Sequence, residues 1–104
     1  MGIIAKLVEA NGTVTNIEFP TSDPNLVDLI KALGGDPDKD RCDRTRGVFG
    51  NWEVLDLPGK GNRLVIGATP FNDSSTGRKS CNLTDEQARN VADYFTLGRR
   101  LLSF

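Results

Sequence analysis

The dipeptide Asn11-Gly12, with an alternating run of residues on either side, constrains the fold more than any other feature of the sequence. Apolar residues alternate with others over residues 3–9 and again over 13–19, as in the strands of a half-buried sheet. Asn-Gly tolerates the positive φ angles of a type I′ turn, which joins two antiparallel strands through two residues. The pattern predicts a β-hairpin, ended by Pro20 because proline cannot donate a hydrogen bond to a sheet.

Residues 24–33 follow this hairpin and have the pattern of an amphipathic helix. Asp23 suits the N-cap, and Pro24 suits the first helical position, where no N–H is needed. The pair Gly34-Gly35 predicts a left-handed end to the helix. The apolar residues that recur with helical spacing are Leu26, Val27, Ile30 and Leu33.

A second helix is predicted to begin at a capping box, with Thr84 at the N-cap and Gln87 three residues later. The position of Gly98 allows two predictions for the end of this helix. The helix either stops there or continues, so that the last apolar residues seal the core. Those residues are Leu101, Leu102 and Phe104.

Two further strands are predicted between the helices, over residues 48–57 and 63–69, with polar loops over 34–47 and 70–82. The element order is therefore ββα-ββ-α. With 104 residues, of which 38% are hydrophobic, we expect one α+β domain over residues 1–104 with an antiparallel or mixed sheet.

The sequence contains no histidine, which excludes Ser-His-Asp and Cys-His triads and histidine-ligated metal sites. The carboxylates show no paired catalytic motif either. We therefore expect no catalytic residues, no metal and no cofactor. A small enzyme that uses an activated lysine or an aspartate stays open as an alternative.

The two cysteines, Cys42 and Cys81, match no Cys-x-x-Cys pattern for a metal or redox site. The first residues carry no signal-peptide pattern, and no apolar run approaches the roughly 20 residues that cross a bilayer. We expect a cytoplasmic protein with two free thiols and no membrane contact, and a disulfide between the two cysteines stays open.

Charge is distributed unevenly, although the whole chain has a net charge of −1. Residues 1–40 carry a net charge of −4, residues 41–79 one of +3, and residues 80–104 none. Within residues 41–79 the basic residues are neighbours in sequence of glycines and of residues with hydroxyl or amide side chains. Glycine lets backbone N–H groups approach an anion, and arginine offers a bidentate fork to phosphate.

Loops of residues 41–79 therefore form a candidate anion site, although no Walker motif occurs. Trp52 is predicted to lie in the core, with a stacking platform or an interface anchor as the alternative. Phe71, beside a proline, is the aromatic residue that we expect to be exposed at the site. The candidate ligand-binding cations are Arg41, Arg44, Arg46, Lys60, Arg63, Arg78 and Lys79.

Two resemblances add to these patterns. The hairpin residues 7–14 and the helix residues 29–35 together resemble the start of small uncharacterised phage- and plasmid-encoded proteins, over residues 3–35. The element order of this part also resembles a ubiquitin-like β-grasp. Leu-Leu-Ser-Phe stands where the β-grasp proteins used in conjugation have a Gly-Gly tail, so we expect no conjugation.

These features together favour a small non-enzymatic binding protein. The phage resemblance implies an accessory or anti-defence factor that blocks a host protein or sequesters a nucleotide-like anion through loops 41–79. Stoichiometric sequestration would suit a compact homodimer. The β-grasp resemblance implies the alternative, a protein-interaction module of a cellular complex.

Overall fold

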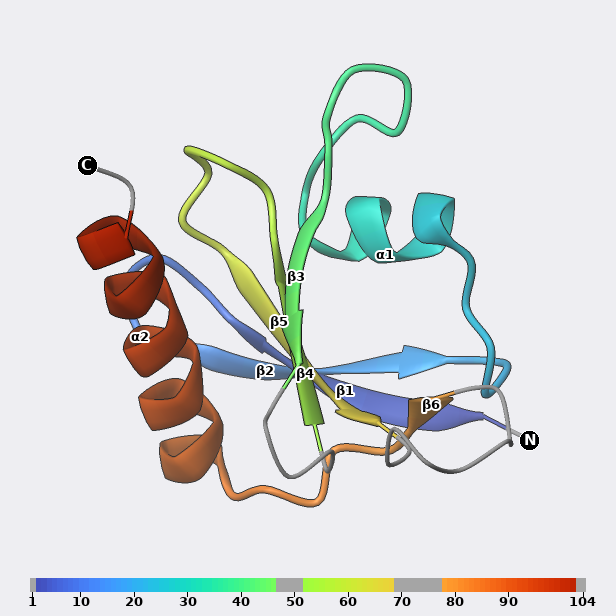
Figure 1. Cartoon of the computed structure of the whole chain (residues 1–104). Helices are drawn as coiled ribbons and strands as arrows, with labels where there is room; N and C mark the ends of the chain where they lie inside the picture. The colour runs from blue at the N-terminus through green and yellow to red at the C-terminus, as the bar shows by residue number, and fades with distance from the viewer. Residues whose placement is uncertain (1, 47–51, 69–77, 103–104) are drawn as a thin grey trace.

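An antiparallel sheet with one helix on each face forms the centre of the protein in the computed structural model, as Figure 1 shows. The structure describes residues 2–46, 52–68 and 78–102, with the backbone alone for Arg46 and residues 96–102. This confirms the predicted single α+β domain. Its elements are β1 (Ile3–Val8), β2 (Val14–Phe19), α1 (Leu26–Ala32), β3 (Asp43–Arg46), β4 (Trp52–Asp56), β5 (Arg63–Ala68), β6 (Arg78–Lys79) and α2 (Asp85–Leu102).

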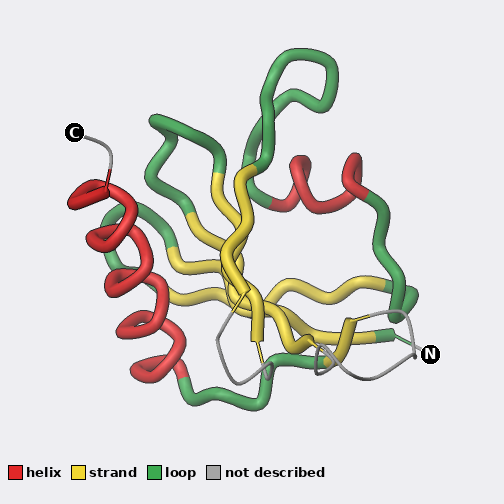
Figure 2. The backbone as a smooth tube through the Cα atoms, viewed as in Figure 1, coloured by secondary structure: helices red, strands yellow, loops and turns green. Residues whose placement is uncertain are grey.

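The strands of the sheet lie in the order β2-β1-β5-β4-β3, with β6 pairing to β5, and every pairing is antiparallel. In Figure 2 the strands lie between the two helices. β5 is the middle strand, and its six residues are all buried. Because a helix covers each face, this strand is apolar on both sides along most of its length.

A short segment containing β6 fills the gap where β1 and β5 diverge. Residues 6–8 of β1 pair with β5, whereas the Ile4 N–H donates instead to Ser80 Oγ at 2.9 Å. The Cys81 N–H in turn donates to the Ile4 carbonyl at 2.8 Å. Gly67 of β5 permits this approach, since a Cβ there would lie 2.6 Å from the Ser80 carbonyl oxygen. The hydrogen bonds of Ile4 with Ser80 and Cys81 thereby hold the residues that follow β6 against β1.

The N-terminal hairpin is confirmed, but its turn differs from the predicted type I′. The Gly12 N–H donates to the Glu9 carbonyl, and the Glu9 N–H donates to the Thr13 carbonyl, both at 2.9 Å. Gly12 has a φ of 90°, whereas no non-glycine residue that the structure describes has a positive φ. The connection is thus a three-residue loop, a type I turn followed by a left-handed glycine. Asn11 favours this form because its side chain accepts the Thr13 N–H at 2.9 Å.

Helix α1 starts two residues later than predicted. Its N-cap is Asn25, whose Oδ1 accepts the Asp28 N–H at 2.9 Å. Asp23 instead belongs to the preceding turn, where its N–H donates to Thr21 Oγ1. The prediction of Asp23 is therefore wrong, and residue type alone does not separate it from Asn25, because asparagine and aspartate cap helices about equally well.

The glycine pair ends α1 as predicted. Gly34 has a φ of 83°, and its N–H donates to the Lys31 carbonyl at 3.0 Å. The Gly35 N–H donates to the Ile30 carbonyl at 2.9 Å, which completes a Schellman motif. A Cβ on Gly35 would lie 2.3 Å from Leu57 Cδ1, so glycine is also needed here for packing against the sheet.

The capping box of α2 is confirmed in both directions. The Gln87 N–H donates to Thr84 Oγ1 at 3.1 Å, and the Thr84 N–H donates to Gln87 Oε1 at 3.0 Å. Of the two predicted ends, the helix takes the longer one and passes through Gly98 to Leu102. The predicted role of Phe104 lies outside the described residues.

Two segments predicted as polar loops contain strands. β3 lies within the predicted loop 34–47, and β6 lies within the predicted loop 70–82. β3 has the sequence Asp-Arg-Thr-Arg at one edge of the sheet, so it shows none of the apolar alternation on which the prediction depended. The strand predicted over 48–57 is described from Trp52 to Asp56, and residues 47–51 lie outside the described part.

The two faces of the sheet have separate cores. The α1 face contains Ile3, Ala5, Phe19, Leu29, Ile30, Leu33, Leu55, Leu57, Leu64 and Ile66. The α2 face contains Val8, Val54, Val65, Ala88 and Ala92. Small alanines on α2 let this helix lie close to the sheet, and the larger residues of α1 fill the wider space on the other side.

Candidate anion-binding cleft

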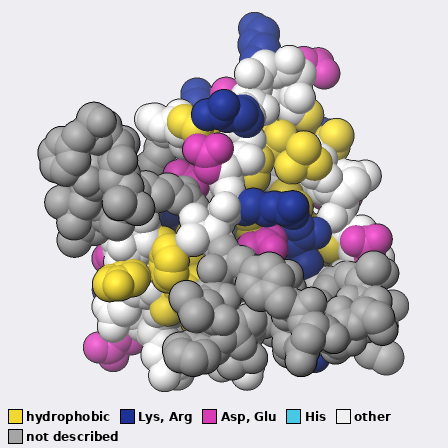
Figure 3. Space-filling view, viewed as in Figure 1, with side chains coloured by type: hydrophobic (Ala, Val, Ile, Leu, Met, Phe, Trp, Pro, Cys, Tyr) yellow, Lys and Arg dark blue, Asp and Glu magenta, His cyan; other side chains and the backbone are white. Residues whose placement is uncertain are grey.

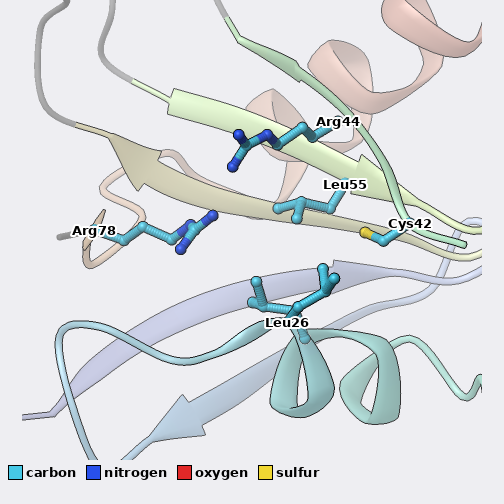
Figure 4. A pocket seen from close by; sticks show the side chains of 6 residues that line it. Leu26, Cys42, Arg44, Leu55 and Arg78 are labelled. Carbon is cyan, nitrogen blue, oxygen red and sulfur yellow. The ribbon is translucent and has the colours of Figure 1, made fainter. Parts of the chain in front are cut away.

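A cleft of about 370 Å³ opens on the α1 face of the sheet. Its walls come from α1, β3 and β6, and β4 provides its floor (Figure 4). Four of the six lining residues are apolar or a thiol, and the other two are arginines. The lining residues are Leu26, Leu29, Cys42, Arg44, Leu55 and Arg78.

The shortness of α1 leaves this cleft open. The helix has seven residues, and Leu29, Ile30 and Leu33 pack onto the sheet. Leu26, in the first turn, remains 58% exposed at the edge of the cleft. Leu55 is completely buried beneath it, so an apolar floor continues past the end of the helix.

Strand register places Arg44 over this floor. Arg44 of β3 pairs directly with Leu55 of β4, and residues opposite one another in a sheet share a face. The Arg44 side chain is exposed, and its guanidinium has no hydrogen-bond or ion-pair partner among the residues that the structure describes. This cation is therefore available to a ligand.

Arg78 approaches the same end of the cleft from β6. Figure 4 shows the guanidinium groups of Arg44 and Arg78 directed toward one another beside Leu55, with the Cys42 sulfur at the other end. The Arg78 N–H of the backbone donates to the Ser22 carbonyl at 2.8 Å, which anchors β6 on the outer side. Residues 34 positions apart in the sequence thus meet at one end of an apolar cleft.

Glu53 holds the Arg78 side chain in place. Glu53 Oε1 accepts a hydrogen bond from Arg78 Nε at 3.2 Å and lies 3.2 Å from Arg78 Nη2 in the same ion pair, and the side chains of Glu53 and Arg78 are 9% and 17% exposed. A buried carboxylate requires such a partner, because an unpaired charge in the interior is strongly unfavourable. Among the described residues, Glu53 is the one partner of the Arg78 guanidinium, which has five N–H donors in all.

Cys42 is a neutral thiol in this setting. Burial raises the pKa of the Cys42 thiol, and Asp43 raises it further, while Arg44 and Arg78 act in the opposite direction. The thiolate is the nucleophilic form of cysteine, so a raised pKa makes this side chain an apolar contact surface and a poor nucleophile.

Figure 3 shows the face that carries the cleft. Apolar side chains over α1 border a group of basic side chains, with an acidic one beside them. The arrangement suits a molecule with an anionic group at one end and an apolar body at the other.

The predicted cations do not converge on one site. Arg44 and Arg78 line the cleft, whereas Arg63 lies on the α2 face and pairs with Asp93 at 2.5 Å. Lys60 is exposed in the turn before β5, at the opposite end of that strand from the residues that pair with β6. Arg63 and Lys60 are therefore separated from the two cleft arginines.

Three further cations are placed outside the cleft lining or are only partly described. Arg41 is 80% exposed and lies 3.5 Å from Asp43. Lys79 is exposed and follows Arg78 on β6. The backbone of Arg46 pairs with Glu53, and its side chain lies outside the described atoms. Phe71 lies outside the described residues altogether.

The apolar half of the cleft and its acidic residue were missed in the sequence. The sequence pattern assigns Leu26 to the apolar side of the helix, gives Leu29 no role beyond the helix, and offers Cys42 only as a free thiol. Glu53 stands in the strand Trp-Glu-Val-Leu-Asp, next to residues that are buried. A charge within a buried strand signals a paired or functional group, and this signal was available from the sequence.

Trp52 and Cys81 belong to the opposite side of the sheet. The Trp52 ring is half-buried and meets Phe95 edge-to-face with centroids 4.9 Å apart, which supports its core assignment. Burial raises the pKa of Cys81. Cys42 and Cys81 are both free and pack against different cores, so no disulfide joins them.

No group of three or more metal-ligating side chains occurs in the part of the chain that the structure describes. Within the same residues, no helix is long and apolar enough to cross a membrane. Comparisons with known protein families, with curated proteins and with solved structures found no match.

Proposed function

We propose that this chain is a small binding protein that holds an organic anion in the cleft and sequesters it without chemical change. The observation that carries this proposal is the meeting of Arg44 and Arg78 at one end of an apolar floor. Guanidinium groups bind oxyanions through paired N–H donors. An apolar part of the ligand would remove the apolar floor from water, which favours binding. A nucleotide-like anion has both parts.

The size and composition of the cleft support binding without turnover. A volume of about 370 Å³ lies within the range of roughly 300–1,000 Å³ that is usual for small-molecule sites. Among its lining residues only Cys42 could act as a nucleophile, and its raised pKa disfavours the thiolate. The proposal therefore includes no catalytic residue and no cofactor.

Isothermal titration calorimetry with a panel of nucleotides and apolar carboxylates tests this proposal. We expect Arg44→Ala to weaken binding of any ligand found by about tenfold, since one charge-assisted contact is lost. Arg41→Ala is the matched control, because Arg41 is also an exposed cation near β3 but does not line the cleft. Absence of heat with every member of the panel, or equal losses in the two variants, would contradict the proposal.

Blocking of a host protein is the second candidate function, in line with an accessory or anti-defence role. Leu26 and Val27 support it, because these neighbours on α1 are 58% and 44% exposed and Leu26 also lines the cleft. Val27→Glu would disrupt an apolar contact there without altering the cleft lining. Affinity capture from host cells should then lose a partner that the wild-type protein retains, and identical captured proteins would exclude this surface.

A further inference from the structure

The two edges of the sheet differ in how they are protected against pairing with another strand. β3 is four residues long and carries three charged side chains, and short, charged edge strands resist such pairing. β2, at the opposite edge, has six residues, of which Glu18 alone is charged. Pro20 lies beyond the end of this strand and removes none of its N–H groups. β2 is therefore the edge that is open to a further strand.

The backbone groups of alternate β2 residues point away from β1. The Glu9 N–H donates to the Thr13 carbonyl, and hydrogen-bonded pairs recur at every second residue along an antiparallel ladder. The odd-numbered residues of β2 therefore bond to β1. The Ile4 N–H, which lies opposite Glu18, accordingly points away from β2 and donates to Ser80. The outward N–H and C=O groups have no partner among the described residues, and they belong to Val14, Asn16 and Glu18.

A second copy of β2 offers the same outward groups with the same spacing, so two copies can pair antiparallel about a two-fold axis. Residues opposite one another share a face, so this axis passes through one residue of β2. An axis at Glu18 would place like charges opposite one another, and an axis at Thr15 or Asn16 would place a threonine opposite Ile17. An axis at Ile17 places Ile17 opposite its own counterpart and Asn16 opposite Glu18 of the second copy. The side chains of β2 therefore favour the register centred on Ile17.

We propose that two copies of this chain pair through β2 in this register and form one antiparallel sheet. Ile17 is half-buried on the α1 face, and opposite residues at a non-hydrogen-bonded position lie close together, so each Ile17 covers the other. On the other face, Lys6 Nζ lies 3.1 Å from Asn16 Oδ1. Glu18 of the second copy lies across Asn16 from this ammonium, so the register also brings opposite charges together.

The pairing edge and the candidate cleft lie at different sides of the sheet. β2 is one edge, whereas the sheet residues that line the cleft belong to β3, β4 and β6. No residue of β2 lines the cleft. The pairing is therefore independent of the proposed function, and either can fail without the other.

Sedimentation equilibrium of the full chain at increasing concentration tests the pairing, and we expect a monomer–dimer equilibrium. Asn16→Pro removes an outward N–H at an edge position that tolerates proline, so it should weaken the dimer by at least about tenfold. Asn16→Ala is the matched control, since it loses the same amide side chain but keeps the N–H, and its dimer constant should stay within about threefold of the wild type. A wild type that stays monomeric, as expected if this edge serves a strand of another protein, would overturn the proposal. An unchanged dimer constant in folded Asn16→Pro would overturn it as well.

Disulfide trapping with oxidised glutathione tests the register and decides the matter if Asn16→Pro fails to fold. In Ile17→Cys the two new thiols lie opposite one another at a non-hydrogen-bonded position, where Cα atoms about 4.5 Å apart permit a disulfide. Thr15→Cys is the matched control on the same face of β2, because residue 15 lies opposite Phe19 of the second copy and far from its own counterpart. We expect mass spectrometry to find a disulfide between two copies of residue 17 and none between two copies of residue 15. A disulfide between two copies of residue 15, or none in either variant, would overturn the proposal.

Discussion

The two faces of the sheet use arginine for different purposes. On the α2 face, a helix of 18 residues covers the strands, and Arg63 is buried against it in an ion pair with Asp93. Lys6 makes a second link from the sheet to this helix, with Asp85 at 2.6 Å. On the α1 face, the helix has seven residues and Arg44 stands uncovered beside an apolar floor.

The difference lies in whether a carboxylate faces the strand cation. On the α2 face, Asp93 and Asp85 of the helix pair with Arg63 and Lys6. On the α1 face, Arg78 pairs with Glu53 of the sheet itself, and Arg44 pairs with no described carboxylate. We therefore expect substitutions to separate stability from binding according to the face on which they lie.

Leu55→Ala should have the largest effect and should lower both the stability of the protein and its affinity for the ligand. Leu55 is completely buried at the floor of the cleft, so its truncation should lower the free energy of unfolding by about 3 kcal/mol. Urea denaturation measures this loss, and titration should show weaker ligand binding. Val54→Ala, one residue away on the α2 face, should lower stability by about 1–2 kcal/mol and leave binding unchanged. A loss of binding in Val54→Ala would remove the distinction between the faces.

Arg63→Ala and Arg44→Ala should behave in opposite ways. Arg63 is 9% exposed and its removal leaves Asp93, which is 59% exposed, without this partner, so we expect a loss of about 2 kcal/mol in stability. Arg44→Ala should change stability by less than about 0.5 kcal/mol, because its guanidinium has no partner among the described residues. Thermal and urea unfolding of both variants measure these values. Equal destabilisation by the two substitutions would show that Arg44 is structural as well.

The smallest expected effect is a change in the alkylation rate of one of the two thiols. Burial raises the pKa of Cys42 and of Cys81, so both should be alkylated by iodoacetamide more slowly than a free cysteine at the same pH, and faster as the pH rises. Arg44 lowers the pKa of Cys42 but is not among the groups that act on Cys81. Arg44→Ala should therefore slow the alkylation of Cys42 alone, as measured by mass spectrometry.

A bound ligand should likewise protect Cys42 and leave Cys81 unchanged, because only Cys42 lines the cleft. Parallel changes at both thiols would indicate a general change in the fold and would contradict a local effect. The predicted homodimer is independent of these results and is tested by sedimentation equilibrium.

Local signals predicted the framework of the fold well. The glycine pair after α1 and the capping box of α2 act through hydrogen bonds within a few residues, and both are confirmed. The candidate site was predicted less completely. Arg44 and Arg78 were among the proposed cations, but nothing in the sequence distinguished them from Lys60 or Arg63.

The reason is that β3 and β6 have no local pattern. Both are short, polar and paired at the margins of the sheet, and they exist through hydrogen bonds to β4 and β5. Without these strands the positions of Arg44 and Arg78 relative to Leu55 could not be derived. Glu53 was the remaining clue, as a charged residue in a strand that is otherwise buried.

The sequence by itself therefore determined six of the eight elements, their order and several of their ends, because turns and caps depend on neighbouring residues. It also determined the absence of histidine chemistry. Only the tertiary structure decided which cations meet, since sheet register and the length of α1 bring together residues far apart in the chain. Arg63 became a link between helix and sheet because Asp93 of α2 lies against it, and Arg44 was left beside an apolar floor because no described carboxylate faces it.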